Sequence, residues 1–240
     1  MRIKEKINMG RDALMENGPI IIGVLGDSVS HGAVAGGGMA HDTVYHNRLR
    51  NKILAVRDYV PVTVINSGIG GTCADDAIPR LYPLLAHKPD LMIVCFGLND
   101  VNRELDVFLP ALKTIFEESI AAGAETIFMT PNMLNTYVSD EVPEELKKYA
   151  GITADMQNSG KMDMYMEKAC AVARECGAKV CDCYSMWKEL AKTEDTTKLL
   201  ANRINHPTRE MHELFADALF KCIFDEQVEA EAVENGMYRG

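Results

Sequence analysis

Five short apolar runs recur along the chain, and a turn-forming segment follows each of them. The runs cover residues 20–25, 62–65, 91–96, 126–130 and 179–182. Their hydrophobic residues are continuous rather than alternating, which is typical of strands that are covered on both faces of a parallel sheet. We therefore predict five buried strands at these positions.

Amphipathic segments separate the strands. Apolar residues recur at helical spacing over 43–56, 75–86, 104–122, 161–176 and 209–224, and a short helix is expected over 186–191. Pro79 weakens the prediction of the second helix. Residues 131–160 are polar and lack a strong period, apart from a helical piece over 144–149. A connection of this length is usually functional or mobile, so we interpret it as an inserted, lid-like loop.

This alternation of strands and helices indicates an α/β fold. We expect a three-layer α/β/α sandwich of flavodoxin-like type around a mostly parallel, five-stranded sheet. A chain of 240 residues fits one domain, with its core at about 19–224, and no repeat or linker divides it. Ligands of such sheets bind at the carboxyl ends of the strands. The residues that follow each strand are therefore the candidates for a functional site.

Charge and cysteine content narrow the class of protein. The net charge of −10 argues against binding to nucleic acid, which requires dominant lysine and arginine. Residues 1–18 lack the apolar stretch of a signal peptide, and no apolar run is long enough to span a bilayer. The seven cysteines fall in apolar segments and are interpreted as buried free thiols. We expect a cytoplasmic protein with no membrane partner, which can form a homo-oligomer.

Four short blocks follow the predicted strands or precede the last helix. They are Gly-Asp-Ser at 26–28, Asn-Ser-Gly-Ile-Gly-Gly at 66–71, Gly-Leu-Asn-Asp at 97–100 and Asn-His-Pro at 205–207. Each alone is a common turn or helix cap. Together they offer a hydroxyl, backbone N–H groups, a side-chain amide and an imidazole. Acyl transfer needs this set: a nucleophile, a base and donors for an oxyanion.

These blocks, in this order, resemble the SGNH or GDSL-like hydrolases over residues 20–220. The resemblance implies that Ser28 is the nucleophile and His206 its general base. It also implies an oxyanion hole made by the N–H groups of Ser28 and Gly71 and by the amide of Asn99. Gly70 takes the place of Gly71 if the alignment is shifted by one residue.

Asp27 and Asp100 also belong to the family pattern. We interpret both as structural residues that hold loops by bonds from side chain to backbone.

One position departs from the family pattern, because Arg203 stands three residues before His206, where the family usually has an aspartate. Three substitutes could accept a hydrogen bond from the imidazole. We favour a main-chain carbonyl near residues 202–203, which resembles family members that work with a Ser-His dyad. The others are a side-chain oxygen of Asn202 or Asn205 and a carboxylate from Asp182 or Asp195.

We expect hydrolysis of a short acyl or acetyl ester through an acyl-enzyme, with a small-molecule substrate that can be an acylated carbohydrate. We expect no cofactor and no metal. The glycine-rich loop 32–42 and the segment 131–160 are expected to shape the pocket, with Met133, Leu134 and Tyr137 as candidate lining residues. The alternatives are a non-catalytic binding module on the same fold, a thioesterase or lysophospholipase-type lipolytic enzyme, and a phosphodiesterase.

Other motifs in the chain do not indicate a different function. The glycines at 68 and 70 imitate a dinucleotide-binding turn, but its third glycine would fall at Cys73. His212-Glu213 begins like a zinc-protease helix and lacks the second histidine, and the spacing of His31, His41 and His46 forms no ligand pair. The chain has no Gly-x-Ser-x-Gly motif, which argues against the α/β-hydrolase fold.

Overall fold

The centre of the molecule is a sheet of five parallel strands in the order β2-β1-β3-β4-β5. The structure is a computed structural model, and it describes residues 3–224. The strands are β1 (Ile20–Gly26), β2 (Val62–Asn66), β3 (Leu91–Cys95), β4 (Glu125–Met129) and β5 (Lys179–Cys181). β3 is buried along its whole length, as its continuous apolar run predicts. The prediction of an α/β fold with a five-stranded sheet is confirmed.

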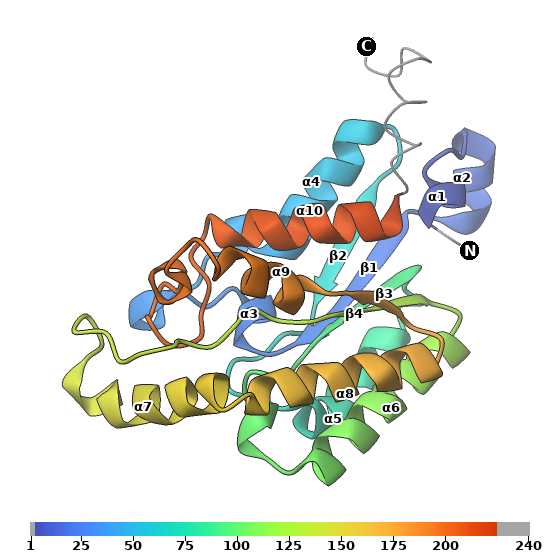
Figure 1. Ribbon diagram of the computed structural model, residues 1–240. Helices are drawn as coiled ribbons and strands as arrows, with labels where there is room; N and C mark the ends of the chain where they lie inside the picture. The colour runs from blue at the N-terminus through green and yellow to red at the C-terminus, as the bar shows by residue number, and fades with distance from the viewer. Residues whose placement is uncertain (1–2, 225–240) are drawn as a thin grey trace.

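Helices cover both faces of this sheet (Figure 1). One layer contains α4 (Tyr45–Val56), α9 (Cys183–Leu190) and α10 (Met211–Ile223), and α4 packs along α10. The other contains α5 (Ala74–Leu85), α6 (Leu105–Ala121) and α8 (Lys161–Glu175), with α6 packed against both neighbours. Helix α5 continues through Pro79 and Pro83. Its buried apolar side chains pack against the sheet and against α6, and this tertiary packing outweighs the weak local propensity.

The remaining elements are short. They are α1 (Ile3–Lys6), α2 (Arg11–Asn17), α3 (Ser28–His31), η1 (Ala35–Gly37), η2 (His41–Thr43), η3 (Asp100–Asn102) and η4 (Thr196–Leu199). Helices α1 and α2 were not expected from the sequence. The ammonium of Lys6 in α1 lies 2.9 Å from a carboxylate oxygen of Asp90, just before β3, and both residues are buried. Among residues 3–224, no helix has the length and apolar character needed to cross a bilayer.

The strand order creates a crevice between β1 and β3. The chain leaves β1 toward β2 on one side and then returns to β3 on the other, so the connections diverge at this point. The ends of the two strands are level, since Gly26 pairs with Cys95. In open α/β sheets this divergence forms the ligand-binding crevice.

The segment 131–160 is more regular than predicted. Helix α7 (Glu144–Asn158) has 15 residues, where the sequence indicated a short piece over 144–149 within a loop. The buried face of this helix is made of Ala150, Thr153, Ala154 and Gln157. Small and polar residues on that face produce no apolar period, which is why the sequence pattern missed it. The helix extends beyond the end of the sheet, in line with α8 (Figure 1).

Candidate active site

Ser28 is held at the carboxyl end of β1 by a one-turn helix. Asp27 caps helix α3 by accepting a hydrogen bond from the Val29 N–H at 2.9 Å. Ser28 is the first residue of α3, so its own N–H has no acceptor within the helix. Its side chain is 5% exposed but lines a cavity. The turn thus directs a hydroxyl and an unpaired N–H group to the same place.

His206 approaches this hydroxyl from the other end of the chain. Its Nε2 lies 3.0 Å from the Oγ of Ser28, which is hydrogen-bond distance across 178 positions of sequence. For Nε2 to accept the hydroxyl proton, the hydrogen of the neutral ring must sit on Nδ1. Burial lowers the pKa of His206, and the Val34 carbonyl partly offsets this effect. The neutral, proton-accepting form is therefore favoured.

The glycines after β2 lie beside Ser28. Gly71 adopts a left-handed φ of +77°, and both Gly70 and Gly71 line the same cavity as Ser28. The N–H of Gly70 is directed to Nδ1 of His31 at 3.3 Å. No hydrogen bond to the N–H of Gly71 is present among residues 3–224. Gly71, rather than Gly70, therefore has the N–H group that is free to donate.

Asn99 follows β3, and its side chain faces the same cavity. Its Nδ2 donates one hydrogen bond to the Thr72 carbonyl at 3.0 Å. An amide nitrogen carries two hydrogens, so this bond fixes the side chain and leaves the second hydrogen available. The structure thus brings together Ser28, Gly71, Asn99 and His206, the four residues at which the sequence motifs pointed.

Two buried carboxyl groups brace the loops behind these residues. The carboxylate of Asp100 accepts from the N–H of Ala74 at 2.7 Å and from the N–H of Gly97 at 2.9 Å, so it joins α5 to the turn after β3. Burial raises the pKa of Asp100 to about 6 and that of Asp27 to about 7. Both carboxyls bond to main-chain N–H groups, as the structural interpretation requires.

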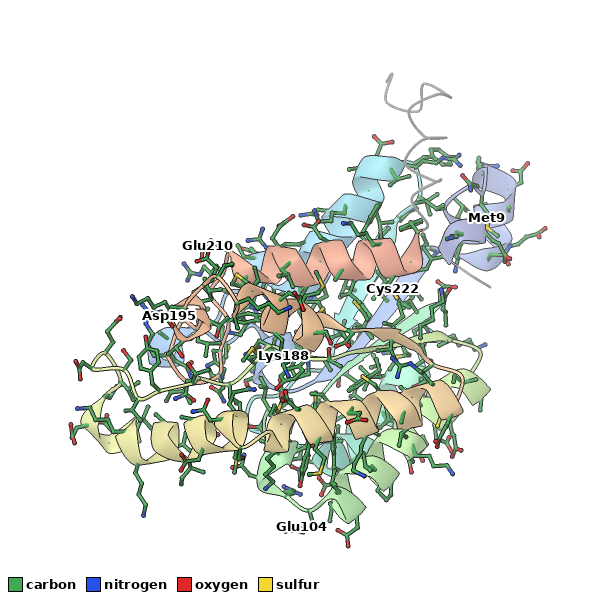
Figure 2. The ribbon with its side chains drawn as sticks, in the orientation of Figure 1. Met9, Glu104, Lys188, Asp195, Glu210 and Cys222 are labelled. Atoms are coloured by element: carbon green, nitrogen blue, oxygen red, sulfur yellow. The ribbon has the colours of Figure 1, made fainter. Side chains whose placement is uncertain are left out.

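The acceptors expected for the His206 ring are engaged elsewhere. Within residues 3–224, Nδ1 of His206 is buried and has no hydrogen-bond partner. Asp182 caps α9, and Asp195, labelled in Figure 2 on the segment between α9 and α10, accepts from the Tyr137 hydroxyl. The side-chain oxygen of Asn202 accepts from main-chain N–H groups. We expected Nδ1 to bond to one of these side chains, to Asn205 or to a main-chain carbonyl at 202–203. That expectation is wrong, since none of them is bonded to Nδ1.

The cavity over Ser28 has a volume of about 890 Å³. Its walls come from the glycine-rich loop, from α7 with the segment before it, and from the loop of His206; the lining includes Val34, Met39, Pro143, Leu146, Tyr149 and Ile204. The expectation that Met133, Leu134 and Tyr137 line the pocket is wrong. The first two are buried in the core, and Tyr137 is turned toward Asp195. Leu146 and Tyr149 fall within the helical piece expected over 144–149, but they were missed because the sequence does not show which side of that piece faces Ser28.

One group of side chains could hold a metal by distance alone. Donor atoms of Cys73, Asp75 and Asp100 lie within 4.8 Å of one another. Asp75 is paired with Arg103 at 2.5 Å, and both oxygens of Asp100 already accept main-chain hydrogen bonds. Burial also raises the pKa of the Cys73 thiol to about 12, so the thiolate that a metal needs is disfavoured. This group therefore fits an internal hydrogen-bonding role better than a metal centre.

Two further histidines, His46 and His212, are buried in the core. Nε2–H of His46 donates to the Ser30 carbonyl at 3.1 Å, and Nδ1 of His212 accepts from the Tyr45 N–H at 3.3 Å. Burial lowers the pKa of His46 to about 4 and that of His212 to about 3. They are packed in the core as neutral rings.

Comparison with known proteins agrees with this geometry. The model of the GDSL-like Lipase/Acylhydrolase family matches residues 24–214. An acetylxylan esterase from Geobacillus stearothermophilus is 25% identical over 170 residues, which are 70% of this chain and 75% of the esterase.

Solved structures show the same fold. The crystal structure of the acetylxylan esterase Axe2 from G. stearothermophilus superposes with a TM-score of 0.66 at 23% identity, covering 87% of this chain and 95% of that chain. Catalytic mutants of Axe2 at a serine, an aspartate and a histidine are also similar. A lipase/acylhydrolase from Enterococcus faecalis gives a TM-score of 0.61 at 19% identity, covering 84% and 94% of the two chains. The chain belongs to the GDSL-like lipase/acylhydrolase family and is a carboxylic ester hydrolase.

Proposed function

We propose that this protein hydrolyses short acyl esters, acetyl esters above all, with Ser28 as nucleophile and His206 as general base. The observation that carries the proposal is the 3.0 Å contact between Nε2 of His206 and Oγ of Ser28. It joins a hydroxyl and an imidazole at the strand crevice where such folds bind ligands.

The reaction follows from this contact. Oγ of Ser28 attacks the ester carbonyl carbon while its proton passes to Nε2 of His206. The C–O bond to the alcohol then breaks, and the departing oxygen takes that proton. Water repeats the two steps on the acyl-enzyme, which releases the acid and restores the hydroxyl. No cofactor is needed for any of these transfers.

An oxyanion hole is part of the proposal. The N–H of Ser28, the N–H of Gly71 and the free hydrogen of the Asn99 amide are its three donors. Gly71 is preferred to Gly70 because the Gly70 N–H is already directed to His31. Donors that are fixed before the reaction lower the energy of the transition state without reorganising.

An acetylated carbohydrate is the substrate class that we favour. The similarity to an acetylxylan esterase supports it. Gly70 leaves open the space beside the nucleophile, because a Cβ there would lie 3.6 Å from the Cβ of Ser28. Glu141, Glu145 and Arg203 at the cavity wall offer polar groups to sugar hydroxyls.

A lipolytic activity on longer acyl chains is the second candidate. The apolar wall formed by Met39, Leu146 and Ile204 favours it, because this surface could cover an acyl chain. A panel of p-nitrophenyl esters from two to ten carbons, beside acetylated xylo-oligosaccharides, separates the candidates. We expect kcat/KM to be highest for acetate and to fall with chain length, whereas a rise with chain length would favour the lipolytic alternative.

Replacing the nucleophile tests the proposal as a whole. Ser28→Ala should lose hydrolysis of p-nitrophenyl acetate by at least about 10³-fold, and it should lose labelling by a fluorophosphonate. Ser159→Ala, at an exposed serine at the end of α7, is the matched control and should keep both. Full activity of Ser28→Ala would contradict the mechanism. A wild-type protein that neither turns over nor reacts with the label would favour a binding module.

A further inference from the structure

Among residues 3–224, no carboxylate is bonded to the imidazole of His206. Arg203, three positions before it, has a left-handed φ of +57°. Its guanidinium donates to the carbonyls of Lys198 and Leu200 at 2.7 and 2.8 Å and pairs with Glu141 at 3.0 Å. These partners lie on the loop itself and on the segment before α7. The Val34 carbonyl interacts with the ring, but Nδ1 of His206 makes no regular hydrogen bond in the described residues, so the position of the ring depends on the main chain that carries it.

One side chain, that of Asn202, binds three successive main-chain N–H groups at His206 and just before it. Oδ1 of Asn202 accepts hydrogen bonds from the N–H groups of Ile204, Asn205 and His206 at 3.1, 3.0 and 2.9 Å. Nδ2 of Asn202 donates to Oδ1 of Asn205 at 2.9 Å. Three successive N–H groups on one oxygen leave this stretch of backbone little freedom to rotate.

A second asparagine attaches the loop to the sheet. Asn132 is fully buried just after β4, and its Nδ2 donates to the Asn205 carbonyl at 2.9 Å. Three residues further on, the N–H of Asn135 donates to the Ile204 carbonyl at the same distance. Before His206, the main-chain N–H groups of Ile204 and Asn205 are therefore bonded to Asn202. The carbonyls of the same two residues are bonded to the segment that follows β4.

We propose that Asn202 is the positioning residue for His206 and that Asn132 anchors the same loop to the sheet. Together they fix the main chain that carries the imidazole, so that Nε2 stays within reach of Ser28 although no carboxylate holds Nδ1. The inference rests on the proposed function, because it assumes that His206 is the base. Asn132 is not among the residues that line the cavity and Asn202 lies at its wall, and both act through the placement of His206.

The substitutions Asn202→Ala and Asn202→Asp test the inference. Alanine removes all the hydrogen bonds of the side chain. Aspartate keeps an oxygen for the three N–H groups, and the Asn205 amide can turn its NH₂ toward the second oxygen. A shift of about 1 Å in a catalytic group costs roughly 10²-fold in rate. We therefore expect Asn202→Ala to lose about 10²-fold in kcat with little change in KM, and Asn202→Asp to recover most of this loss.

The leaving group supplies a readout that a purely structural role would not change. A misplaced His206 protonates the departing alcohol poorly, which matters little for p-nitrophenol and much for an alkyl alcohol. Asn202→Ala should therefore lose more activity on ethyl acetate than on p-nitrophenyl acetate. Asn17→Ala, an exposed asparagine on α2 with one bond to the backbone, is the control and should behave as wild type.

The outcomes distinguish the two proposals. If Ser28→Ala is inactive while Asn202→Ala keeps its kcat, or loses activity equally on both esters, the positioning role is wrong and the Ser-His mechanism stands. If Ser28→Ala is active, the mechanism itself is wrong. Should Asn202→Ala fail to fold, Asn132→Leu provides the second test, because it cuts the link to the Asn205 carbonyl with a side chain of similar size. Unchanged turnover of a folded Asn132→Leu would also overturn the inference.

Discussion

At the scale of single residues, the burial of His206 sets the pH range in which it can accept a proton. Burial lowers the pKa of the imidazole from its usual value of 6.5, and the Val34 carbonyl reverses only part of this change. A general base works only when it is unprotonated. The acid side of the activity profile should therefore fall at a lower pH than for an exposed histidine.

A pH profile of kcat/KM for p-nitrophenyl acetate between pH 4.5 and 8 checks this prediction. We expect a plateau near neutrality and an acid limb with its midpoint below 6.5. His41→Gln, which changes an exposed histidine near the glycine-rich loop, should leave the midpoint unchanged. A midpoint at or above 6.5 would show that the base is an ordinary exposed imidazole or another group.

Asn99 gives the second prediction at this scale. Its side chain is already fixed by the bond to the Thr72 carbonyl, so its second hydrogen can act in the transition state without a cost of ordering. Asn99→Ala should lower kcat by roughly 10²–10³-fold and change KM much less. Steady-state kinetics with p-nitrophenyl acetate measure this, with the exposed Asn158→Ala as control. A kcat within threefold of wild type would remove Asn99 from the oxyanion hole.

At the scale of elements, helix α7 is attached through buried polar side chains. Thr153 donates to Oδ1 of Asn135 at 2.6 Å, and Nδ2 of Asn135 donates to the carbonyls of Tyr137 and Ala150 at 2.9 and 2.8 Å. Gln157 accepts from the Leu134 N–H at 2.9 Å. These bonds replace the apolar stripe that usually fixes a helix, so the position of this cavity wall depends on them.

Asn135→Leu tests how α7 is held. The substitution removes the partner of several buried polar groups, and each buried group left without a bond costs about 1–3 kcal/mol. We expect a loss of about 2–4 kcal/mol in the free energy of unfolding, measured by urea denaturation. Asn158→Ala removes one exposed bond from α7 to the Thr136 carbonyl and should cost less than about 1 kcal/mol. Equal effects of the two variants would show that this network does not hold the helix.

The same polar contacts explain what the sequence could not predict. The strands were found because their apolar runs are continuous, and residues 91–96 are all buried. The part of α7 after residue 149 was not predicted because the buried face of the helix is small and polar, and α1 was not predicted because Ile3 and Ile7 are too few to make a period.

For the candidate site, the motif blocks pointed to Ser28, Gly71, Asn99 and His206, which the structure gathers at one cavity. The sequence named Asn202 as a possible partner of the His206 ring, but it did not predict that Asn202 would instead bind main-chain N–H groups, because such bonds leave no signature in residue types. The role of Asn132 depends on a contact across 73 positions, which only the fold reveals.

At the scale of the whole molecule, buried ionisable groups give opposite contributions to the pH dependence of stability. Burial raises the pKa of Asp27 from 3.8 to about 7, so between these values the native state binds more protons than the unfolded state. The free energy of unfolding then falls as pH rises through this window. His46 and His212 act in the other direction, because their lowered pKa values make the native state lose stability as pH falls below 6.5. Stability should therefore be greatest in a mildly acidic range.

Asp27→Asn isolates the carboxyl contribution. The amide oxygen can still cap α3, but the side chain no longer ionises, so any fixed cost of the substitution is the same at every pH. Between pH 5 and pH 8 the free energy of unfolding of the wild type should fall by about 2–3 kcal/mol relative to that of the variant, since a tenfold change in proton affinity corresponds to ~1.4 kcal/mol. Urea denaturation of both proteins at the two pH values measures this difference. Asp58→Asn, which removes an exposed carboxylate, should follow the wild type at both pH values. Parallel behaviour of Asp27→Asn and wild type would mean that Asp27 is already ionised in the folded protein at pH 5 and that burial does not raise its pKa.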